Sequence, residues 1–306
     1  MPELEPNVPP PRRVTPLEMP AVPRDGLRFP LTRDQLVTRV KDALDEDGAF
    51  NDITTIATVR SDRRARASLV ARQGGTIAGI PFALETFRML DPKVSMRVDK
   101  EDGKRAMKGE IVLYISGHAR AMLSAERVAL NFLMRLSGIA TLTSRYVDAV
   151  RGTGVKILDT RKTTPGWRSL EKYAVRAGGG TNHRMDLASS VLIKDNHLAA
   201  VDGNVEIAVR RARELSPAAR IEIECITADQ VATAAASGAD IILLDNMPLD
   251  LMRECVKVTA RRSQLEASGG VTLDNVRAIA ETGVNMISVG ALTHSAAALN
   301  LALDFE

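Results

Sequence analysis

From residue 155 to residue 291 the chain alternates between short apolar runs and helical segments, and this alternation constrains the fold more than any other feature. Strands that alternate with helices form right-handed βαβ units around a parallel sheet. Helix-end signals agree: we expect Thr227 and Thr272 to cap helices, Pro248 to open one and Gly283 to end one. Six runs have strand character: residues 155–160, 191–196, 221–226, 240–246, 264–269 and 286–291.

Two architectures contain such a sheet, the doubly wound fold and the β/α barrel. A doubly wound dinucleotide-binding sheet needs G-x-G-x-x-G directly after its first strand. The only glycine cluster, at 178–180, lies well beyond the first expected strand, and no G-x-x-x-x-G-K-[ST] is present. The expected strands end in polar residues, and a barrel builds its active site at these strand ends. We therefore predict a barrel, incomplete because six strands are found instead of eight.

The chain ahead of this region mixes helical and strand-like runs in no regular order, which is typical of an α+β domain. Its first helix follows a capping-box pattern formed by Thr32 and Gln35. A long helical stretch from about Ala121 to Leu136 is predicted to break at Ser137–Gly138, before a second helix reaches Val150. The other expected elements are strands at 67–71, 94–98 and 111–115 and a helix at 81–90.

A chain of 306 residues accommodates about two domains. We place an α+β domain at residues 29–136 and the barrel at 137–291, and residues 292–306 are free to return to the first domain. Residues 1–28 are predicted to be a disordered tail, because eight of the 14 prolines of the chain lie within it.

Composition excludes several classes of protein. Aromatic residues make up 3% of the chain and the net charge is +3, which argues against a nucleic-acid binder. The longest uncharged run, Thr282–Leu303, is interrupted by polar residues and glycines and makes a poor membrane span. The two cysteines, Cys225 and Cys255, exclude a disulfide scaffold and a cysteine zinc site, and the tail lacks the apolar core of a signal peptide. We therefore expect a cytoplasmic protein.

Positive charge gathers in residues 159–197, which hold seven basic and four acidic residues. Arg161, Lys162 and Lys194 lie at or just past the ends of expected strands, where a barrel mouth would collect them. Arginine pairs bidentately with carboxylates and phosphates and lysine acts as a point charge, so we interpret this group as a site for a small ligand with several negative charges. Three further basic residues lie on a helix-like run, where we expect a solvated face: Arg168, Lys172 and Arg176.

Two acidic residues, Glu224 and Asp245, end successive strands and would lie near each other inside a barrel. Two carboxylates opposite a polyphosphate usually hold Mg²⁺, with phosphate oxygens completing the coordination. The same two acids could instead form ion pairs with Lys162 and Lys194. The two roles are compatible, because the ion pairs could form before the substrate binds. Side chains alternate along a strand, so Cys225 should point away from the barrel axis as a buried, inert thiol.

The last two strands end in small-residue loops, ASGGV at 267–271 and SVGAL at 288–292. Small residues let backbone N–H groups approach an anion, and helix starts expected at Thr272 and Thr293 would add their dipoles. Barrels often bind a phosphate after their last two strands. The two loops together therefore favour a phosphate site.

The histidines show no metal-binding spacing. His183, next to Arg184, is expected to contact a carboxylate, and the other three are expected to be structural or on the surface: His118, His197 and His294. On the long helix ahead of the barrel, Arg127 is placed where it could reach a neighbouring subunit.

Seven longer motifs stand out along the chain: LSAERVALNFLMRLSGIATLT (123–143), DTRKTTPGWRSLEKYAVRAGGGTNHR (159–184), VLIKDNH (191–197), IEIE (221–224), ILLDNM (242–247), LEASGGV (265–271) and SVGALTHS (288–295). In this order they resemble the quinolinate phosphoribosyltransferase family, also called carboxylating nicotinate-nucleotide pyrophosphorylases. The similarity runs from about Leu31 to the end of the chain and includes NDITT at 51–55.

The resemblance implies an α/β fold in which an N-terminal α/β sandwich domain is joined to an incomplete barrel. It implies a homodimer whose active sites take residues from both chains. It also implies a reaction of quinolinate with 5-phosphoribosyl 1-pyrophosphate and Mg²⁺ that yields nicotinate mononucleotide, pyrophosphate and CO₂.

Position by position, the resemblance implies that Arg127 reaches quinolinate across the dimer. Arg161, His183 and Arg184 resemble the other contacts to its two carboxylates, and Thr160 belongs to the same substrate-binding segment. Lys162 and Lys194 resemble the lysines near the pyrophosphate and the reacting ring, and Glu224 and Asp245 resemble the acids around the ribose and the metal. Two loops resemble those that bind the 5′-phosphate: Ser268, Gly269 and Gly270 in one, and Val289, Gly290 and Ala291 in the other.

Three positions depart from the family pattern. Met134 replaces a common glutamine, and Asp186 and Ser189 stand where glycine and aspartate are frequent. None of them replaces a charge-bearing contact, so the activity is still expected and only the shape of the loop before VLIKDNH is in question.

Three other functions stay open. A lyase would use Lys162 or Lys194 as a Schiff base, but it would not need both small-residue loops together with Glu224 and Asp245. A related nicotinate phosphoribosyltransferase binds a substrate with one carboxylate and has less need of four cationic contacts. A non-enzymatic anion-binding or nucleic-acid-binding protein does not fit the confinement of charge to one segment.

Overall fold

The computed structural model describes residues 26–306, which divide into two compact units. Unit 1 comprises residues 26–140 and 297–306, and unit 2 comprises Thr141–Ala296. Most of the expected tail lies outside the described residues. Among the described residues, no helix is both long and apolar enough to cross a membrane.

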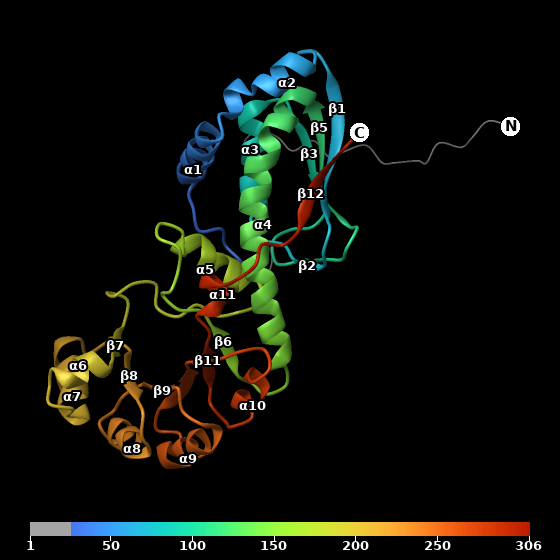
Figure 1. Ribbon diagram of the computed structural model, residues 1–306. Helices are drawn as coiled ribbons and strands as arrows, with labels where there is room; N and C mark the ends of the chain where they lie inside the picture. Colours follow the sequence, from blue (N-terminus) through green and yellow to red (C-terminus); the bar gives the residue numbers. More distant parts are fainter. Residues whose placement is uncertain (1–25) are drawn as a thin grey trace. The chain divides into compact units, whose positions relative to one another are not determined.

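Unit 1 is built on an antiparallel sheet with the strand order β12-β1-β5-β3. The strands are β1 (Arg64–Ala71), β3 (Ser95–Val98), β5 (Ile111–His118) and β12 (Leu301–Phe305). Strand β12 pairs with β1 from Ala67↔Phe305 to Ala71↔Leu301, so the C-terminal residues form one edge of this sheet (Figure 1). Short elements complete the unit: η1 (Ala49–Asn51), α2 (Ile53–Thr58), β2 (Gly75–Thr76) and β4 (Arg105–Ala106).

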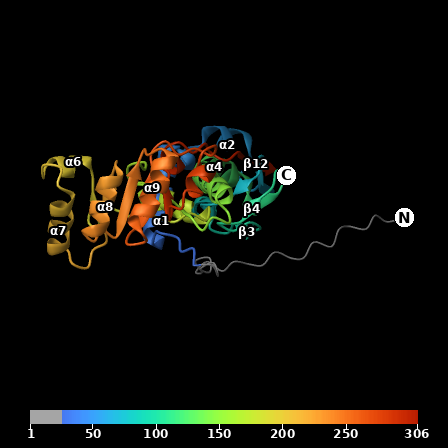
Figure 2. The ribbon, with the colours of Figure 1, turned by 90° about the horizontal axis from the view of Figure 1, so that it is seen from below.

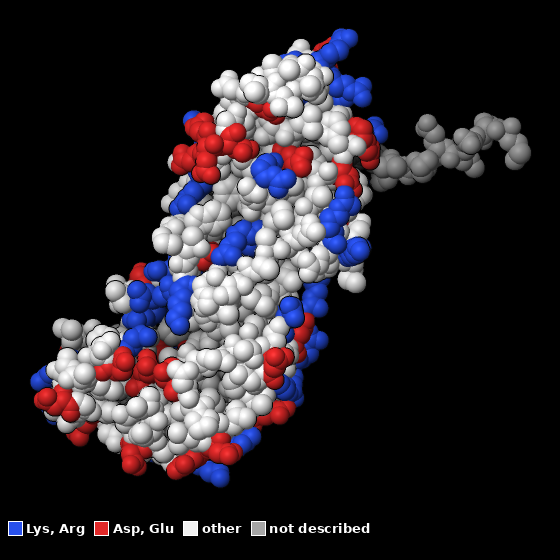
Figure 3. All heavy atoms as spheres, viewed as in Figure 1, with Lys and Arg blue, Asp and Glu red and all other residues white. Residues whose placement is uncertain are grey.

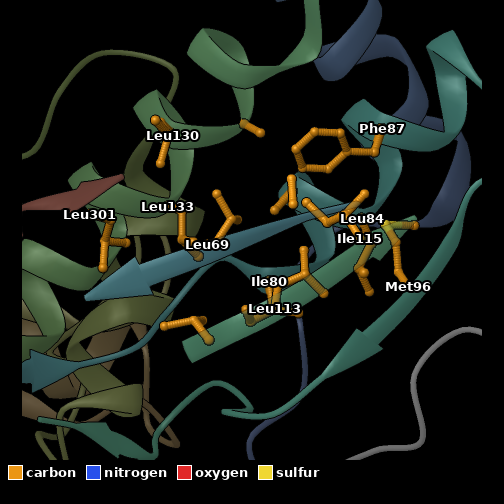
Figure 4. Packing of buried hydrophobic residues seen from close by; sticks show 14 of the residues in the cluster. Leu69, Ile80, Leu84, Phe87, Met96, Leu113, Ile115, Leu130, Leu133 and Leu301 are labelled. Atoms are coloured by element: carbon orange, nitrogen blue, oxygen red, sulfur yellow. The ribbon is translucent and has the colours of Figure 1, made fainter. Parts of the chain in front are cut away.

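The core of unit 1 lies between this sheet and two helices, α3 (Ile80–Leu90) and α4 (Ala119–Ala149). Figure 4 shows Leu84 and Phe87 of α3 and Leu133 of α4 packed with Leu69 and Ile115 of the sheet. Burying apolar side chains in this way is the main stabilising contribution to such a unit. Helix α1 (Arg33–Glu46) packs on α3, and its predicted capping box is confirmed between Thr32 and Gln35.

Helix α4 is continuous, so the predicted break at Ser137–Gly138 is wrong. Both residues serve packing instead. A Cβ atom on Gly138 would lie 2.1 Å from the carbonyl oxygen of Ala297, so only glycine lets the returning C-terminal segment approach the helix. The Ser137 hydroxyl accepts the Ala78 N–H at 2.9 Å and donates to the Ala78 carbonyl at 3.2 Å. The division between the units accordingly falls after Ala140, inside the helix.

Unit 2 contains six parallel strands in the order β6-β11-β10-β9-β8-β7. The first two strands of unit 2, β6 and β7, lie at opposite edges of this sheet, and the described residues show no pairing between them. This is an incomplete barrel, and each predicted strand is present in it, some of them shortened. The strands are β6 (Lys156–Leu158), β7 (Val191–Ile193), β8 (Ile221–Cys225), β9 (Ile241–Asp245), β10 (Gln264–Ser268) and β11 (Met286–Ser288).

Helices α7, α8, α9 and α10 lie on the outer side of the arc that the sheet forms (Figure 1). Figure 2 shows α7, α8 and α9 side by side in chain order. The Thr227 side chain caps α8 by accepting the Gln230 N–H, as predicted. The helices are α5 (Arg168–Ala177), α6 (Asp195–Ala199), α7 (Val205–Leu215), α8 (Ala228–Ala236), α9 (Leu249–Thr259), α10 (Val276–Ala280) and α11 (Ala291–His294).

Two predicted helix starts are wrong. Helix α10 begins at Val276 and not after Thr272, because the Asn275 side chain accepts the Thr272 N–H and donates to the Gly270 carbonyl, which closes a turn there. Thr293 lies inside the short helix α11 and does not start a helix.

Candidate active site

The carboxyl ends of the parallel strands bring the predicted basic and acidic residues to one end of unit 2. Lys194 follows β7, Glu224 and Asp245 lie at the ends of β8 and β9, and Arg161 and Lys162 follow β6. Figure 3 shows, on the visible face of unit 2, a group of Lys and Arg side chains beside a group of Asp and Glu side chains. Such a mixed end suits a ligand that carries anionic groups and a metal ion.

The two predicted metal-binding acids interact. Burial raises the pKa of Glu224, and the negative charge of Asp245 raises it further, while Lys194 opposes both effects. The Lys194 Nζ atom lies 3.6 Å from Glu224 Oε2. A carboxylate with a raised pKa beside a second carboxylate gains from a nearby cation, so these two acids fit an Mg²⁺ site.

Lys162 lies against the loop that follows β11. The Thr293 hydroxyl donates to the Lys162 carbonyl at 2.8 Å, and the Lys162 N–H donates to the Thr160 hydroxyl at 3.1 Å. A Cβ atom on Gly290 would lie 3.1 Å from Lys162 Cδ and 3.2 Å from His294 Nε2. The small residue at 290 therefore makes room for the side chain of Lys162, and it brings the Val289–Ala291 loop to the end of β6.

The loop after β10 requires its glycines. Gly269 and Gly270 have φ of +90° and +58°, in the left-handed region that favours glycine. A Cβ atom on Gly269 would lie 2.2 Å from Asn246 Oδ1, whereas one on Gly270 would meet nothing within 4 Å. The Asn246 N–H donates to the Ser268 carbonyl at 2.9 Å, so this loop is joined to the end of β9. The structure thus places the predicted phosphate loop beside Asp245.

Lys172 does not belong to a solvated helix face, which corrects the prediction for this residue. Its side chain is fully buried and its Nζ atom contacts the buried carboxylate of Asp159. Burial lowers the pKa of Lys172 and raises that of Asp159, and the attraction between them opposes both shifts. Asp159 also accepts the His183 N–H at 2.9 Å, and Lys172 donates to the His183 carbonyl at 3.0 Å. The ion pair therefore fixes the backbone at His183.

Two arginines of the candidate site, Arg161 and Arg184, interact through their charges. Burial lowers the pKa of Arg184, and the positive charge of Arg161 lowers it further. The Arg184 Nη1 atom donates to the Ser190 carbonyl at 3.0 Å. The Arg161 Nε atom is buried and has no hydrogen-bond partner among residues 26–306. Two guanidinium groups held close enough to repel each other gain from an anion between them.

The His183 ring contacts two acids that the sequence analysis did not single out. The His183 Nε2 atom lies 3.0 Å from Glu222 Oε2 and 3.6 Å from Glu266 Oε1. A signal for them was available: because strand side chains alternate, Glu222 shares a face with Glu224, and Glu266 shares one with Ser268. Burial and the charge of Glu222 raise the pKa of Glu266 to about 7.

A cavity of about 800 Å³ lies at the opposite end of the strands. Its lining includes Lys156, Ile241 and Gln264, which begin β6, β9 and β10. The cavity extends to His183 and Glu266. This hollow therefore reaches from the amino ends of the strands to the side chains of His183, Arg184 and Glu266.

The structure also places the other residues that the sequence analysis singled out. Arg127 lies exposed on α4 in unit 1, whereas the other candidate residues belong to unit 2. Asp186 accepts the Ser189 N–H at 2.8 Å, so these two departures from the family pattern bond to each other within one turn. Met134 packs against the core of unit 1. Cys225 is a buried thiol whose pKa is raised to about 12, first by burial.

Comparisons with known proteins cover nearly all of the described chain. Residues 52–137 match the N-terminal domain, and residues 139–304 the C-terminal domain, of quinolinate phosphoribosyl transferase. The probable nicotinate-nucleotide pyrophosphorylase [carboxylating] of Bacillus subtilis is 45% identical over 85% of this chain and 89% of its own length. The nicotinate-nucleotide pyrophosphorylase [carboxylating] of Mycobacterium leprae is 45% identical over 87% of this chain and 95% of its own.

Solved structures agree with this family. The NadC protein of Streptococcus pyogenes has a TM-score of 0.85 at 40% identity, covering 90% of this chain and 99% of its own. Human nicotinic acid phosphoribosyltransferase has a TM-score of 0.59 at 12% identity, covering 84% of this chain and 73% of its own, and so shares the fold alone. On these matches, the chain belongs to the quinolinate phosphoribosyltransferase family.

Proposed function

We propose that this chain transfers a phosphoribosyl group from 5-phosphoribosyl 1-pyrophosphate to quinolinate and releases CO₂. The ring nitrogen of quinolinate bonds to the anomeric carbon of ribose while the carbon–oxygen bond to pyrophosphate breaks. The adjacent carboxylate then leaves as CO₂, and its electron pair stays on the ring carbon, which takes up a proton. The products are nicotinate mononucleotide, pyrophosphate and CO₂, on the route to NAD.

The arginine pair carries this proposal. Arg161 and Arg184 lie close enough to lower the pKa of Arg184, and Arg161 Nε is buried without a partner among the described residues. Quinolinate carries two neighbouring carboxylates, and each can pair with a guanidinium through charge-assisted hydrogen bonds. Nicotinate, with one carboxylate, would leave one of the two guanidinium groups unpaired, which disfavours the nicotinate enzyme as an alternative.

The other end of the site suits the phosphoribosyl donor. We assign Lys162 and Lys194 to the pyrophosphate and the reacting ring, and Glu224 and Asp245 to the ribose and to Mg²⁺. The ion, held by these acids and by phosphate oxygens, would neutralise charge on the leaving pyrophosphate. The loops Ser268–Gly270 and Val289–Ala291 would bind the 5′-phosphate through backbone N–H groups, and the φ angles of Gly269 and Gly270 support this assignment.

Charge stabilisation is the main catalytic effect that this site can supply. Breaking the bond to pyrophosphate generates an oxocarbenium-like ribose, so fixed charges and correct positioning lower the barrier. Neither step requires a cysteine or serine nucleophile, and the two cysteines are both buried. A Schiff-base lyase would use one of the two lysines, but it would not explain the arginine pair or the Gly269–Gly270 loop.

We further propose a homodimer in the cytoplasm, with Arg127 completing the partner's site. Arg127 is exposed on α4. In the same unit, Phe50, Ile53 and Ile56 are exposed apolar side chains on adjacent short helices, with exposed fractions of 47%, 80% and 50%. Large exposed apolar residues that lie close together are typical of protein interfaces. The two unpaired cysteines are compatible with a reducing compartment.

One assay tests the activity. The protein is incubated with quinolinate, 5-phosphoribosyl 1-pyrophosphate and Mg²⁺, and CO₂ and nicotinate mononucleotide are measured. We expect both products in equal amounts, and no turnover when nicotinate replaces quinolinate. Turnover of nicotinate alone would favour the related enzyme, and trapping of a keto substrate by borohydride on Lys162 or Lys194 would favour the lyase.

A further inference from the structure

A cluster of three buried side chains, His183, Glu222 and Glu266, lies inside the barrel of unit 2. The exposed fractions of the three side chains are 11%, 4% and 1%. Glu222 comes from β8 and Glu266 from β10, so two different strands place carboxylates on the same imidazole nitrogen. Neither acid belongs to the set that would contact substrate or metal, and their role needs an explanation of its own.

The hydrogen bonds of the ring determine where its proton lies. The backbone N–H of Arg184 donates to His183 Nδ1 at 2.8 Å. A ring nitrogen that accepts a hydrogen bond carries no hydrogen, so in the neutral ring the hydrogen is on Nε2 and points at Glu222, 3.0 Å away. The lone pair of Nε2 is then not available to a metal ion. In this tautomer His183 is not a metal ligand through Nε2, although three possible ligands are close together.

The same contacts connect the cluster to Arg184. Both backbone groups of His183 are held, the N–H by Asp159 and the carbonyl by Lys172. The ring is held at Nε2 by Glu222, with Glu266 3.6 Å away, and its Nδ1 atom in turn accepts the N–H of Arg184. If the ring rotated, it would lose that contact, and the backbone from which the Arg184 guanidinium extends would be released.

We propose that Glu222 and Glu266 are positioning residues, which fix the Nε2–H tautomer of His183 and through it hold Arg184 in place for the substrate carboxylates. Glu222 is the acceptor because its oxygen is the nearer one, and the charge of Glu266, 3.6 Å from the same nitrogen, supports the Nε2–H form. The consequence for substrate binding rests on the proposed function, whereas the tautomer itself does not.

The pKa shifts decide when this arrangement holds: a protonated ring carries hydrogen on both nitrogens and cannot accept the Arg184 N–H, so the tautomer applies only above the titration of His183. Burial lowers the pKa of His183, but the hydrogen bond and charge of Glu222, together with the charge of Glu266, outweigh burial and leave it raised. Other charges face the cluster: Lys172 from α5 opposes this rise, Asp159 just after β6 raises the pKa of Glu266, and Arg184 interacts with the charge of Glu222. The Ser288 hydroxyl of β11 lowers the pKa of Glu266.

The first test measures the tautomer without substrate. Long-range ¹H–¹⁵N NMR correlations distinguish the two neutral tautomers of a histidine, and only four histidines need assignment, with His183→Gln identifying its own signals. We expect His183 to carry its hydrogen on Nε2 in the intact protein at a pH above its titration. A hydrogen on Nδ1 would overturn the proposal, whether or not the protein uses quinolinate.

The second test compares two replacements of Glu222. Glu222→Leu removes the acceptor at similar volume, and we expect it to raise KM for quinolinate by about tenfold, the effect of one lost hydrogen bond, with KM for the phosphoribosyl donor unchanged. Glu222→Gln keeps an acceptor oxygen and should recover most of that loss. Glu206→Gln, on the exposed face of α7, is the matched control.

Two results would overturn the proposal at this stage. One is an unchanged KM for quinolinate in Glu222→Leu. The other is a Glu222→Gln protein as impaired as Glu222→Leu, since the charge and not the acceptor would then matter. If Glu222→Leu does not fold, as judged by thermal melting, Glu266→Gln takes its place and should broaden or shift the His183 ring signals. A Glu266→Gln spectrum identical to that of the intact protein would overturn the role of Glu266.

Discussion

The Nζ atom of Lys172 contacts the carboxylate of Asp159 inside unit 2, and neither side chain is exposed to solvent. The same two side chains hold the carbonyl and the N–H of His183. One buried ion pair therefore links β6 and α5 to the segment that carries Arg184. Such a pair adds little net stability, because desolvation offsets the attraction, but it is costly to break from one side.

Lys172→Met should therefore destabilise the protein strongly. The methionine fills a similar volume but leaves the Asp159 carboxylate buried without its cation, which costs about 3–5 kcal/mol in comparable cases. Urea unfolding followed by circular dichroism gives the free energy. Lys41→Met is the control, because the pair of Lys41 with Asp45 is exposed and its loss should change the free energy of unfolding little. Equal effects of the two substitutions would show that loss of the ion pair with Asp159 is not the cause of the destabilisation in Lys172→Met.

The sequence could not reveal this pair. Lys172 lies on a helical run with Arg168 and Arg176, and three cations at that spacing are typical of a solvated face. Burial of a charged residue depends on a partner, and Asp159 comes from a different element. Glu222 and Glu266 were missed for a related reason: strand alternation assigns them to the inner face, but only the fold shows that both meet His183.

The barrel, by contrast, was predictable. All six strands follow from local apolar runs with polar ends, and that pattern is independent of long-range contacts. Gly138 shows the limit of such reasoning. A glycine after a serine inside a helical run indicates a break, yet here it allows the approach of Ala297, a residue remote in sequence. The helix start predicted at Thr272 failed similarly, because a turn closed by Asn275 competes with capping.

The two acids at the strand ends should affect turnover more than quinolinate binding. Glu224→Ala and Asp245→Ala remove the ligands proposed for Mg²⁺ but leave the arginine pair intact. We expect each variant to lose most of kcat and to need more Mg²⁺, while calorimetry shows nearly unchanged quinolinate affinity. Loss of quinolinate binding with an unchanged Mg²⁺ requirement would mean that the acids act on the other substrate.

Adjacent glycines provide a matched comparison for the phosphate loop. Gly270→Ala forces alanine into the left-handed region at a cost of about 1–2 kcal/mol, but its Cβ atom meets nothing within 4 Å. Gly269→Ala adds a clash with Asn246, whose side chain donates to Asp245 Oδ2 at 2.9 Å. We expect Gly269→Ala to raise KM for the phosphoribosyl donor much more than Gly270→Ala does. Similar KM values for the two variants would indicate that Asn246 moves without disturbing the site.

The position of Arg127 gives a test of the shared active site. Arg127 belongs to unit 1, whereas Arg161, His183 and Arg184 belong to unit 2. If Arg127 serves the partner's site, Arg127→Ala and Arg184→Ala homodimers should each be nearly inactive. Each lacks a charge-assisted contact to a substrate carboxylate, and such a contact contributes about 1.5–3 kcal/mol to binding.

Mixing the two variants and allowing subunits to exchange distinguishes a shared site from a site within one chain. In a mixed dimer, one site then contains both substitutions and the other contains neither. Random exchange makes about half of the dimers mixed, so activity should recover to about a quarter of the unsubstituted level. Native mass spectrometry verifies the exchange. If mixed dimers form and activity does not return, Arg127 acts in the site of its own chain, because every mixed dimer would then carry one lesion in each site.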